Sequence, residues 1–519
     1  MILILHGWLL EGSGSNLWTR SIITALARSG ETVHLVCQEN HPDRYDAIAE
    51  AYRHRLSGNI ETKLSRTVPF PGKCILHQPE IGDTLPVFVK DKYEEYEHVV
   101  PMIELPDDVI ETYIERNVNV VRRIAAEHDI TAIHANHAVL MSVVAERVSA
   151  ETGIPFVIMP HGSDIEYAVK KDDRFKRYAS SAMNKARTIF VIGDEMRSRV
   201  RNVFAEIQHI EDKLVELHLG VDASQFEPIP RESRPSNIRK LADTLAGQER
   251  GKLSAHYNDK LPDPDVEQKL ESIDWLENQV LLFTGRIISQ KGIQSIIAAL
   301  PLILDRTPRV RLIVVGHGPL REPMQSFLTA LQNGDRDRVR EIVATGQKLE
   351  GSLEQDVRDD LPGLTSFFEK LERRGETDRY FDAARRLIKA DTVVFTGYLT
   401  HRELRFLFPC CDVGIFPSIV REAGPLVFLE SLASGCFPLG TYFGGMAASI
   451  DAVSRDLPDE VAATMKLSLD ETVESLVEQV PRALSIAPRY SNDLARIARE
   501  RYDWTSVADT FLKNLCEPD

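Results

Sequence analysis

Two glutamates frame a Gly-Pro pair within residues 421–430, which read Arg-Glu-Ala-Gly-Pro-Leu-Val-Phe-Leu-Glu. Gly424 can cap a helix, and Pro425 suits the first helical position, where its missing N–H costs nothing. Glu422 then precedes the helix and Glu430 lies in its second turn. Free backbone amides and the positive helix end between these carboxylates suit an anion, and the carboxylates can accept hydrogen bonds from hydroxyls. The spacing therefore predicts a site for a diphosphate with hydroxylated groups at its ends.

Two cations follow a predicted strand in the same half of the chain. The apolar run 280–284 ends at Gly285, and Arg286 and Lys291 come next, before Gly292. Cations at the end of a strand can neutralise a diphosphate, and the glycines allow close approach of the backbone. A solvated loop is the alternative for this pattern alone. Together with the two-glutamate segment, the pattern favours a diphosphate site.

Histidines follow two predicted strands in the first half. His161 comes after the strand 155–159, and His134 and His137 accompany the strand 132–134. A histidine at the end of a strand can hydrogen-bond a polar substrate. Metal ligation is the alternative, but no cluster of carboxylates or cysteines supports it, so we predict no metal site.

A Gly-x-Gly pattern at Gly12, Ser13 and Gly14 invites comparison with a dinucleotide fingerprint, but Leu17 stands where a third glycine would be. A bound dinucleotide cofactor is therefore disfavoured. A loop whose amides reach a substrate and a plain turn between strand and helix both remain open.

Alternating strands and helices must position these residues. Apolar runs predict strands at 2–5, 33–37, 132–134, 155–159, 188–192, 215–217, 280–284, 310–315, 393–395, 413–416 and 437–439. Helical patterns run over 16–28, 106–128, 292–305 and 504–515, and from Leu426 to a stop at Gly435. Strands that alternate with helices predict two doubly wound α/β halves with parallel sheets, which bind ligands at the carboxyl ends of their strands.

Two charged stretches interrupt this alternation. Residues 231–275 read as a helical insertion or linker between domains, and residues 321–389 read as an added helical pair within the second half. We therefore predict one domain over 1–230 and another over 276–499.

Bulk composition narrows the partners and the compartment. The 519 residues carry a net charge of −16, so the surface as a whole should repel nucleic acid and anionic membranes; we expect no nucleic-acid partner, and peripheral membrane association is left open. The basic run 196–201 reads as a solvated helix face.

Six cysteines without a Cys-x-x-Cys pattern read as reduced thiols. We also find no signal peptide pattern and no run of apolar residues that could span a bilayer, and we expect a cytoplasmic protein.

The order and spacing of these motifs resemble glycosyltransferase family 4, whose members are retaining, nucleotide-sugar-dependent enzymes with the GT-B fold. The resemblance rests on the Gly-Ser-Gly loop and on residues 133–137, 160–164, 220–228, 285–292, 315–319, 395–397, 411–418, 422–430, 444–445 and 502–504. It implies two Rossmann-like domains that face each other across a cleft. The first would bind the acceptor and the second the nucleotide sugar, and the last helix, about 500–519, would pack back on the first.

The resemblance also implies roles for single residues. Arg286 and Lys291 would hold the donor diphosphate, Glu430 the ribose, and Glu422 the donor sugar with the amides around Gly424, Pro425 and Leu426. His161 would lie beside the transferred sugar, and the nucleobase near Tyr398 and Leu399. We place Gly12, Ser13, Gly14 and His137 on the acceptor side. No metal and no cofactor are expected, because Arg, Lys and the helix dipole supply positive charge.

The implied reaction displaces a nucleoside diphosphate by an acceptor hydroxyl with retention. A phosphorylase of the same fold, which uses inorganic phosphate, and a non-catalytic nucleotide-sugar-binding protein are the alternatives. Ala423 and Pro425 depart from the family's usual Glu-Gly-Phe-Gly, and so bear on the contact to the donor sugar. The nucleotide, the sugar, the oligomeric state and the acceptor, whether sugar, sugar phosphate, glycan or lipid-linked, are not readable from the sequence.

Overall fold

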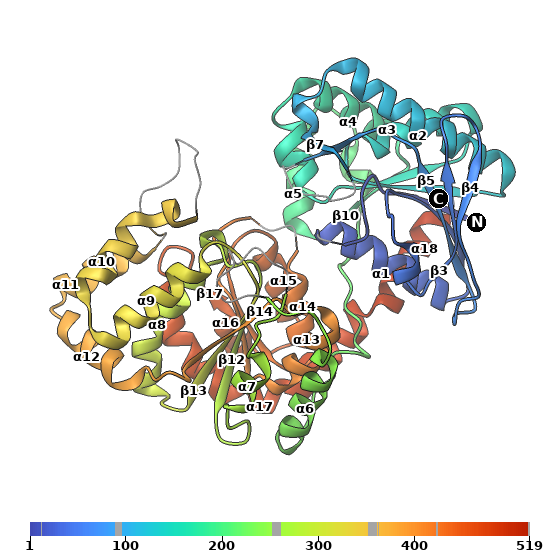
Figure 1. Cartoon of the computed structure of the whole chain (residues 1–519). Coiled ribbons are helices and arrows are strands. Elements are labelled where there is room, and N and C mark those ends of the chain that lie inside the picture. The colour runs from blue at the N-terminus through green and yellow to red at the C-terminus, as the bar shows by residue number, and fades with distance from the viewer. Residues whose placement is uncertain are drawn as a thin grey trace. The chain divides into compact units, whose positions relative to one another are not determined.

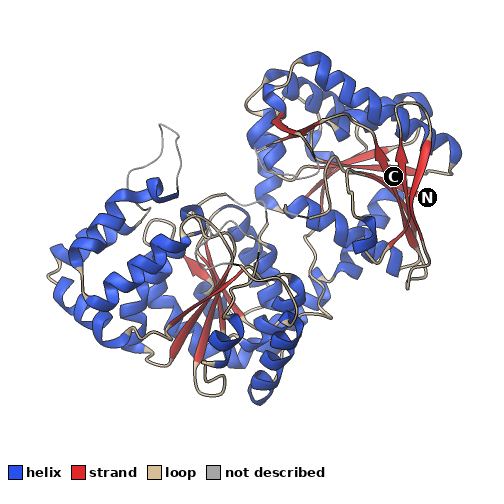
Figure 2. Cartoon of the chain, viewed as in Figure 1, coloured by secondary structure: helices blue, strands red, loops and turns tan. Residues whose placement is uncertain are grey.

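The computed structural model describes residues 1–11, 13–88, 96–251, 261–350, 361, 363–421 and 424–516. The chain forms two compact units, Met1–Gly220 with Tyr502–Asp519 and Val221–Arg501 (Figure 1). Each unit consists of a largely parallel sheet with helices around it, so the predicted α/β class is confirmed (Figure 2). No helix in these described ranges is long and apolar enough to cross a membrane.

The sheet of the first unit has the order β11-β10-β9-β8-β1-β2-β5-β3-β4. Its strands are β1 Ile2–Leu5, β2 Thr32–Val36, β3 Ile48–His54, β4 Ile60–Ser65, β5 Lys73–Pro79, β8 Ala132–Asn136, β9 Phe156–Met159, β10 Thr188–Val191 and β11 Leu214–Glu216. Only β3 and β4 pair antiparallel among these strands. A separate parallel pair joins β6 Thr84–Val87 to β7 His98–Pro101. The predicted strands of this half are present, and β6 lies where we expected an edge strand and loop from Leu85 onward, but β3, β4, β5 and β7 were not predicted.

The helices of the first unit are α1 Gly14–Arg28, α2 Asp107–Glu127, α3 Met141–Thr152, α4 Asp173–Lys185, α5 Asp194–Val203 and α18 Trp504–Cys516. Helices lie on both faces of this sheet (Figure 1), and all four residues of the apolar strand β1 are buried, as expected for a parallel strand. Helix α18 packs beside α1, with the Phe511 ring 6.1 Å from that of Trp18 and 5.7 Å from that of Phe190. The last helix thus completes the core of the first unit.

The second unit has the strand order β14-β13-β12-β15-β16-β17, and every neighbouring pair is parallel. The strands are β12 Gln279–Thr284, β13 Val310–Val315, β14 Val393–Gly397, β15 Val413–Phe416, β16 Phe437–Thr441 and β17 Lys466–Leu467. Its helices are α6 Arg234–Leu245, α7 Val266–Glu271, α8 Ile293–Arg306, α9 Arg321–Asn333, α10 Arg336–Thr345, α11 Leu364–Arg373, α12 Thr377–Leu387, α13 His401–Leu407, α14 Leu426–Ala433, α15 Gly444–Ser454, α16 Asp459–Thr464 and α17 Thr472–Tyr502.

The two charged stretches belong to this second unit. Helix α6 of the 231–275 stretch is anchored by Arg234, whose guanidinium lies 2.8 Å from the buried Asp412 carboxylate. The described part of the 321–389 stretch contains four α-helices, α9 to α12, where we predicted a pair. Left-handed glycines explain part of the difference, because Gly334 at φ 67° and Gly375 at φ 67° end helices that would otherwise run on.

Candidate active site

Loops at the carboxyl ends of β12, β13 and β15 contact one another in the second unit. The amide of Ile287 donates to the carbonyl of His317 at 2.8 Å, and the amide of Ile419 donates to the carbonyl of Gln290 at 2.9 Å. The loop after β12, which carries both predicted cations, therefore lies between the loops after β13 and β15. This is the edge of a parallel sheet where ligands bind.

Lys291 ends a single 3-10 turn, Ser289–Lys291, and Gly292 turns the chain into α8 at φ 75°. A side chain cannot stand at Gly292, since a Cβ there would lie 2.0 Å from the carbonyl oxygen of Pro417. This close approach fixes Lys291 beside the loop that follows β15. Arg286 is exposed, and no salt bridge joins it to another residue that the structure describes.

Helix α14 begins at Leu426, where the helical pattern starts, but Pro425 does not fill the first helical position predicted for it. Pro425 has φ −87° and ψ 103°, so its backbone is extended and it serves as the N-cap in place of Gly424. The predicted stop is present, with Gly435 at φ 69° directly after the C-cap Ser434. Glu422 lies outside the described residues.

Glu430 lies in the second turn of α14 with its side chain 6% exposed, and its Oε1 lies 2.7 Å from Nε2 of His401. His401 is the first residue of α13, and Thr400 and Glu403 form a capping box around the start of that helix. The imidazole thus fixes one carboxylate oxygen of Glu430 from a second helix. His401 was not predicted as a site residue.

Tyr398 and Leu399 follow β14. The ring of Tyr398 meets the ring of His317 edge to face, with centroids 5.4 Å apart. Leu399 is buried, whereas Tyr398 is partly exposed. Both residues were predicted to lie near the nucleobase, but only Tyr398 has an exposed part that a ligand could contact.

The loops that carry the predicted His137 and His161 are tied to one buried carboxylate, that of Asp164. Asp164 accepts hydrogen bonds from the backbone amides of Ala138 at 2.6 Å, Gly162 at 2.8 Å and Ile165 at 3.0 Å. These bonds tie the loop after β8 to the loop after β9. A single turn of π-helix, Ile165–Val169, follows directly, a feature often found at functional sites.

His161 hydrogen-bonds the side chain of Asn136, with Nε2 and Oδ1 2.8 Å apart. The side-chain amide nitrogen of Asn136 donates to Thr19 Oγ1 at 3.1 Å, so the side-chain oxygen of Asn136 faces the imidazole of His161. This oxygen can only accept, so Nε2 of His161 carries the proton. Burial lowers the pKa of His161 well below its ordinary value. A neutral His161 therefore presents Nδ1 as a hydrogen-bond acceptor.

His137 is 1% exposed and has left-handed backbone, with φ 72°. Its ring lies among those of Trp8 at 4.6 Å, His161 at 4.7 Å and Phe88 at 5.0 Å. Burial lowers its pKa well below the usual value. His137 thus supports His161 within an aromatic cluster.

Ser13 caps α1 by accepting a hydrogen bond from the amide of Asn16 at 3.3 Å, and Gly14 is the first residue of that helix. Gly12 lies outside the described residues. The start of α1 therefore stands at the carboxyl end of β1, and its contact with a substrate stays a prediction.

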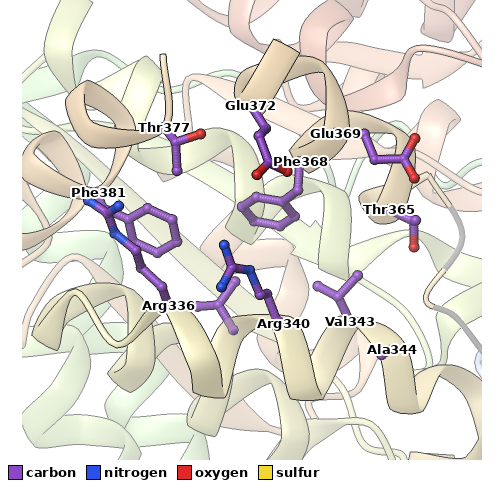
Figure 3. Close-up of a pocket in the computed structure, with 11 residues that line it drawn as sticks. Arg336, Arg340, Val343, Ala344, Thr365, Phe368, Glu369, Glu372, Thr377 and Phe381 are labelled. Atoms are coloured by element: carbon purple, nitrogen blue, oxygen red, sulfur yellow. The ribbon is translucent and has the colours of Figure 1, made fainter. Parts of the chain in front are cut away.

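No group of three or more histidine, cysteine, aspartate or glutamate side chains in the described part of the chain could hold a metal ion. The five cysteines whose side chains are described are free and buried. A cavity of about 280 Å³ lies in the inserted helices, between α10, α11 and α12 (Figure 3). Phe368 and Phe381 line it, and none of the predicted site residues does.

Comparison with known families decides the class of enzyme. Residues 82–225, which include His137 and His161, match the family described as Glycosyltransferase Family 4. Residues 373–492, which include Tyr398 and Glu430, match the family described as Glycosyl transferases group 1. The chain is a glycosyltransferase.

Solved structures share the fold of this transferase. A glycosyltransferase from Rickettsia africae superposes with a TM-score of 0.57 at 14% identity over 100% of this chain and 99% of that one. Sucrose-phosphate synthase from Thermosynechococcus elongatus gives 0.52 at 15% identity over 98% and 96%. HepE from Anabaena, solved with UDP and glucose, gives 0.50 at 16% identity over 99% and 98%. The predicted GT-B class is thereby confirmed. A comparison with curated proteins finds no similar sequence.

Proposed function

We propose that this transferase moves a sugar from a nucleoside-diphosphate sugar to an acceptor hydroxyl, with retention of configuration and without a metal ion. The observation that carries the proposal is Glu430, a buried carboxylate one turn inside a helix that starts beside the sheet edge. His401 holds Oε1 of Glu430 at 2.7 Å. A carboxylate fixed in this way is suited to accept hydrogen bonds from the two ribose hydroxyls.

The diphosphate would lie between Glu430 and the loop after β12. The first amides of α14 have no partners within the helix, and they bring the positive end of the helix dipole to an anion. Arg286 and Lys291 would add two positive charges. Together these groups neutralise the charge that grows on the leaving diphosphate.

In the reaction the bond from the anomeric carbon to the diphosphate oxygen breaks, and a bond from that carbon to the acceptor oxygen forms. The acceptor proton passes to an oxygen of the departing diphosphate. Neutral His161 suits a place beside the sugar, since it can accept a hydrogen bond from a hydroxyl without adding positive charge near the cationic transition state.

UDP is the first nucleotide to test, because the Anabaena protein of the same fold is solved with UDP-glucose. Calorimetry with UDP, GDP, ADP and inorganic phosphate, each with and without EDTA, tests donor class and metal independence together. One nucleoside diphosphate should bind regardless of EDTA, and turnover of its sugar should give a product with the donor's anomeric configuration. Binding of phosphate but of no nucleotide would overturn the proposal and favour a phosphorylase.

A further inference from the structure

Residues Leu261–Asp263, which we call the strap, lie across the carboxyl end of β14, an edge strand of the second sheet. Pro262 forms an antiparallel bridge with Gly397. The amide of Asp263 donates to the carbonyl of Thr396 at 2.8 Å, and the amide of Tyr398 donates to the carbonyl of Leu261 at 3.0 Å. The backbone of Tyr398 is therefore held by a segment that comes from the stretch between the two sheets in sequence.

The strap and β14 approach so closely that only glycine fits at the crossing. Gly397 has left-handed backbone, with φ 76°. A Cβ at this position would lie 2.6 Å from the amide nitrogen of Asp263 and 2.7 Å from the carbonyl oxygen of Leu261. These are backbone atoms, so a side chain could be accommodated only if the strap moved away.

A buried ion pair locks the strap to the neighbouring strand's loop. The Asp263 carboxylate, 6% exposed, accepts from both terminal nitrogens of Arg321, with Nη1 2.7 Å from Oδ1. Lys269 from α7 adds a contact of 2.7 Å to Oδ2. Arg321 starts α9, directly after the loop that carries His317, and its guanidinium lies 5.5 Å from the centroid of the Phe395 ring.

Burial of such a pair costs desolvation energy that its attraction offsets only in part, so an apolar contact would stabilise the fold equally well. What the pair adds is a fixed geometry. Asp263 joins the end of β14 to the loop after β13, and these are the two loops from which Tyr398 and His317 meet edge to face.

We propose that the strap is a positioning element for the nucleobase of the donor. Leu261 of the strap holds the backbone of Tyr398, and the Asp263–Arg321 pair fixes the strap in place. The strap thereby determines where the loop that carries Tyr398 contacts a heterocyclic base. The inference rests on the proposed nucleoside-diphosphate donor. In this proposal the strap, which is distant in sequence from the loop after β14, contributes to selectivity for the base but not to binding of the diphosphate.

The experiment measures dissociation constants for UDP, GDP, ADP and inorganic pyrophosphate in the full chain. The variants are Asp263→Asn and the apolar double variant Asp263→Leu with Arg321→Met, which removes both charges of the buried pair and leaves Lys269 its ion pair of 2.8 Å with Asp265. Asp391→Asn is the control, because it removes an ion pair of 2.9 Å with Arg311. That pair lies at the amino ends of β13 and β14, away from the strap. Gly397→Ala displaces the strap without changing any charge.

In the strap variants we expect the best nucleoside diphosphate to bind about tenfold more weakly, which corresponds to about 1.4 kcal/mol, with less preference over the other two bases. Pyrophosphate affinity should change less than about twofold, and Asp391→Asn should leave all four constants unchanged. Asp263→Glu should restore part of the preference.

Equal losses of affinity for pyrophosphate and nucleotide would show a merely structural role and overturn the inference. Unchanged base preference in folded Gly397→Ala would do so as well. If the native transferase binds pyrophosphate and no nucleoside diphosphate, the proposed donor itself is wrong and the inference fails with it.

Discussion

The imidazole of His401 and the carboxylate of Glu430 meet at 2.7 Å, although they lie on different helices and 29 positions apart in the sequence. The contact joins the start of α13 to the second turn of α14. The side chain of Glu430 is 6% exposed and that of His401 is 40% exposed, so the histidine connects a buried carboxylate to the surface.

Replacement of Glu430 by glutamine tests this carboxylate directly. Glu430→Gln keeps the shape but replaces one acceptor oxygen with a donor, so we expect at least about tenfold weaker binding of the preferred nucleoside diphosphate. Calorimetry with inorganic pyrophosphate should show little change, because the ribose is absent. Glu478→Gln in the exposed part of α17 is the matched control. Unchanged nucleotide affinity in Glu430→Gln would remove this residue from its assigned role.

Lys291 should affect turnover more than binding. Lys291→Met removes a charge that, in the proposed function, faces the leaving diphosphate, and we expect kcat to fall about 100-fold, as for the loss of one preorganised donor elsewhere. Steady-state kinetics with saturating donor measures this. Arg309→Met, which removes a cation that is 68% exposed at the amino end of the same sheet, should leave kcat unchanged. A fall in kcat of equal size in both variants would count against a specific role for Lys291.

Asp164 holds two loops together, and its loss should reach His161. In Asp164→Asn one carboxylate oxygen that accepts backbone hydrogen bonds becomes an amide donor facing amide donors. We expect a lower free energy of unfolding by about 1–3 kcal/mol, measured by chemical unfolding, together with a higher KM for the donor sugar. Asp164→Glu should rescue neither property, because the fully buried site has no room for a further methylene.

A second histidine cluster predicts how stability depends on pH. His77 lies between His34 and His54, with a nitrogen–nitrogen distance of 3.0 Å on each side, and the ring of His128 lies 4.3 Å from that of His34. Burial lowers the pKa of His34 and of His54 to about 4. The folded chain thus keeps these histidines neutral where the unfolded chain takes up protons.

Each such histidine makes its full contribution to the free energy of unfolding above the unfolded-state pKa of about 6.5. That contribution is lost as the pH falls toward 4, by about 1.4 kcal/mol per pH unit. The urea midpoint of the first unit should therefore fall between pH 7 and pH 5, and it should fall less steeply in His54→Gln. His98→Gln, at an exposed position of β7, is the control. An identical pH dependence in native protein and His54→Gln would contradict this account.

The sequence predicts strands well where burial on both faces makes an apolar run. Strand β13 shows this, since five of its six residues are buried and Arg311 is the exception. Strand β4 escaped prediction because it pairs at the sheet edge and all six of its residues are exposed or half-buried, so no apolar run marks it. Polar residues such as His77, buried inside strand β5, also hide the pattern.

The positions of the candidate site residues can be predicted to a similar extent. The placement of Lys291 and His161 next to strand ends was predictable, because parallel strands bring their carboxyl ends to one edge. The partnership of His401 with Glu430 was not, because it depends on how two helices pack. Pro425 fits an N-cap and a first helical turn equally well by φ, and only its ψ of 103° decides.

Helix α18 has a consequence for biosynthesis. The ribosome makes Trp504–Cys516 only after the entire second unit, yet Phe511 covers Trp18 and Phe190 in the first. Until that helix emerges, the nascent first unit carries an uncovered apolar face, and chaperones have time to bind it. Completion of the first unit therefore has to wait until the second unit has been made, so a premature stop within α17 should leave a protein whose earliest-made half is the part that aggregates.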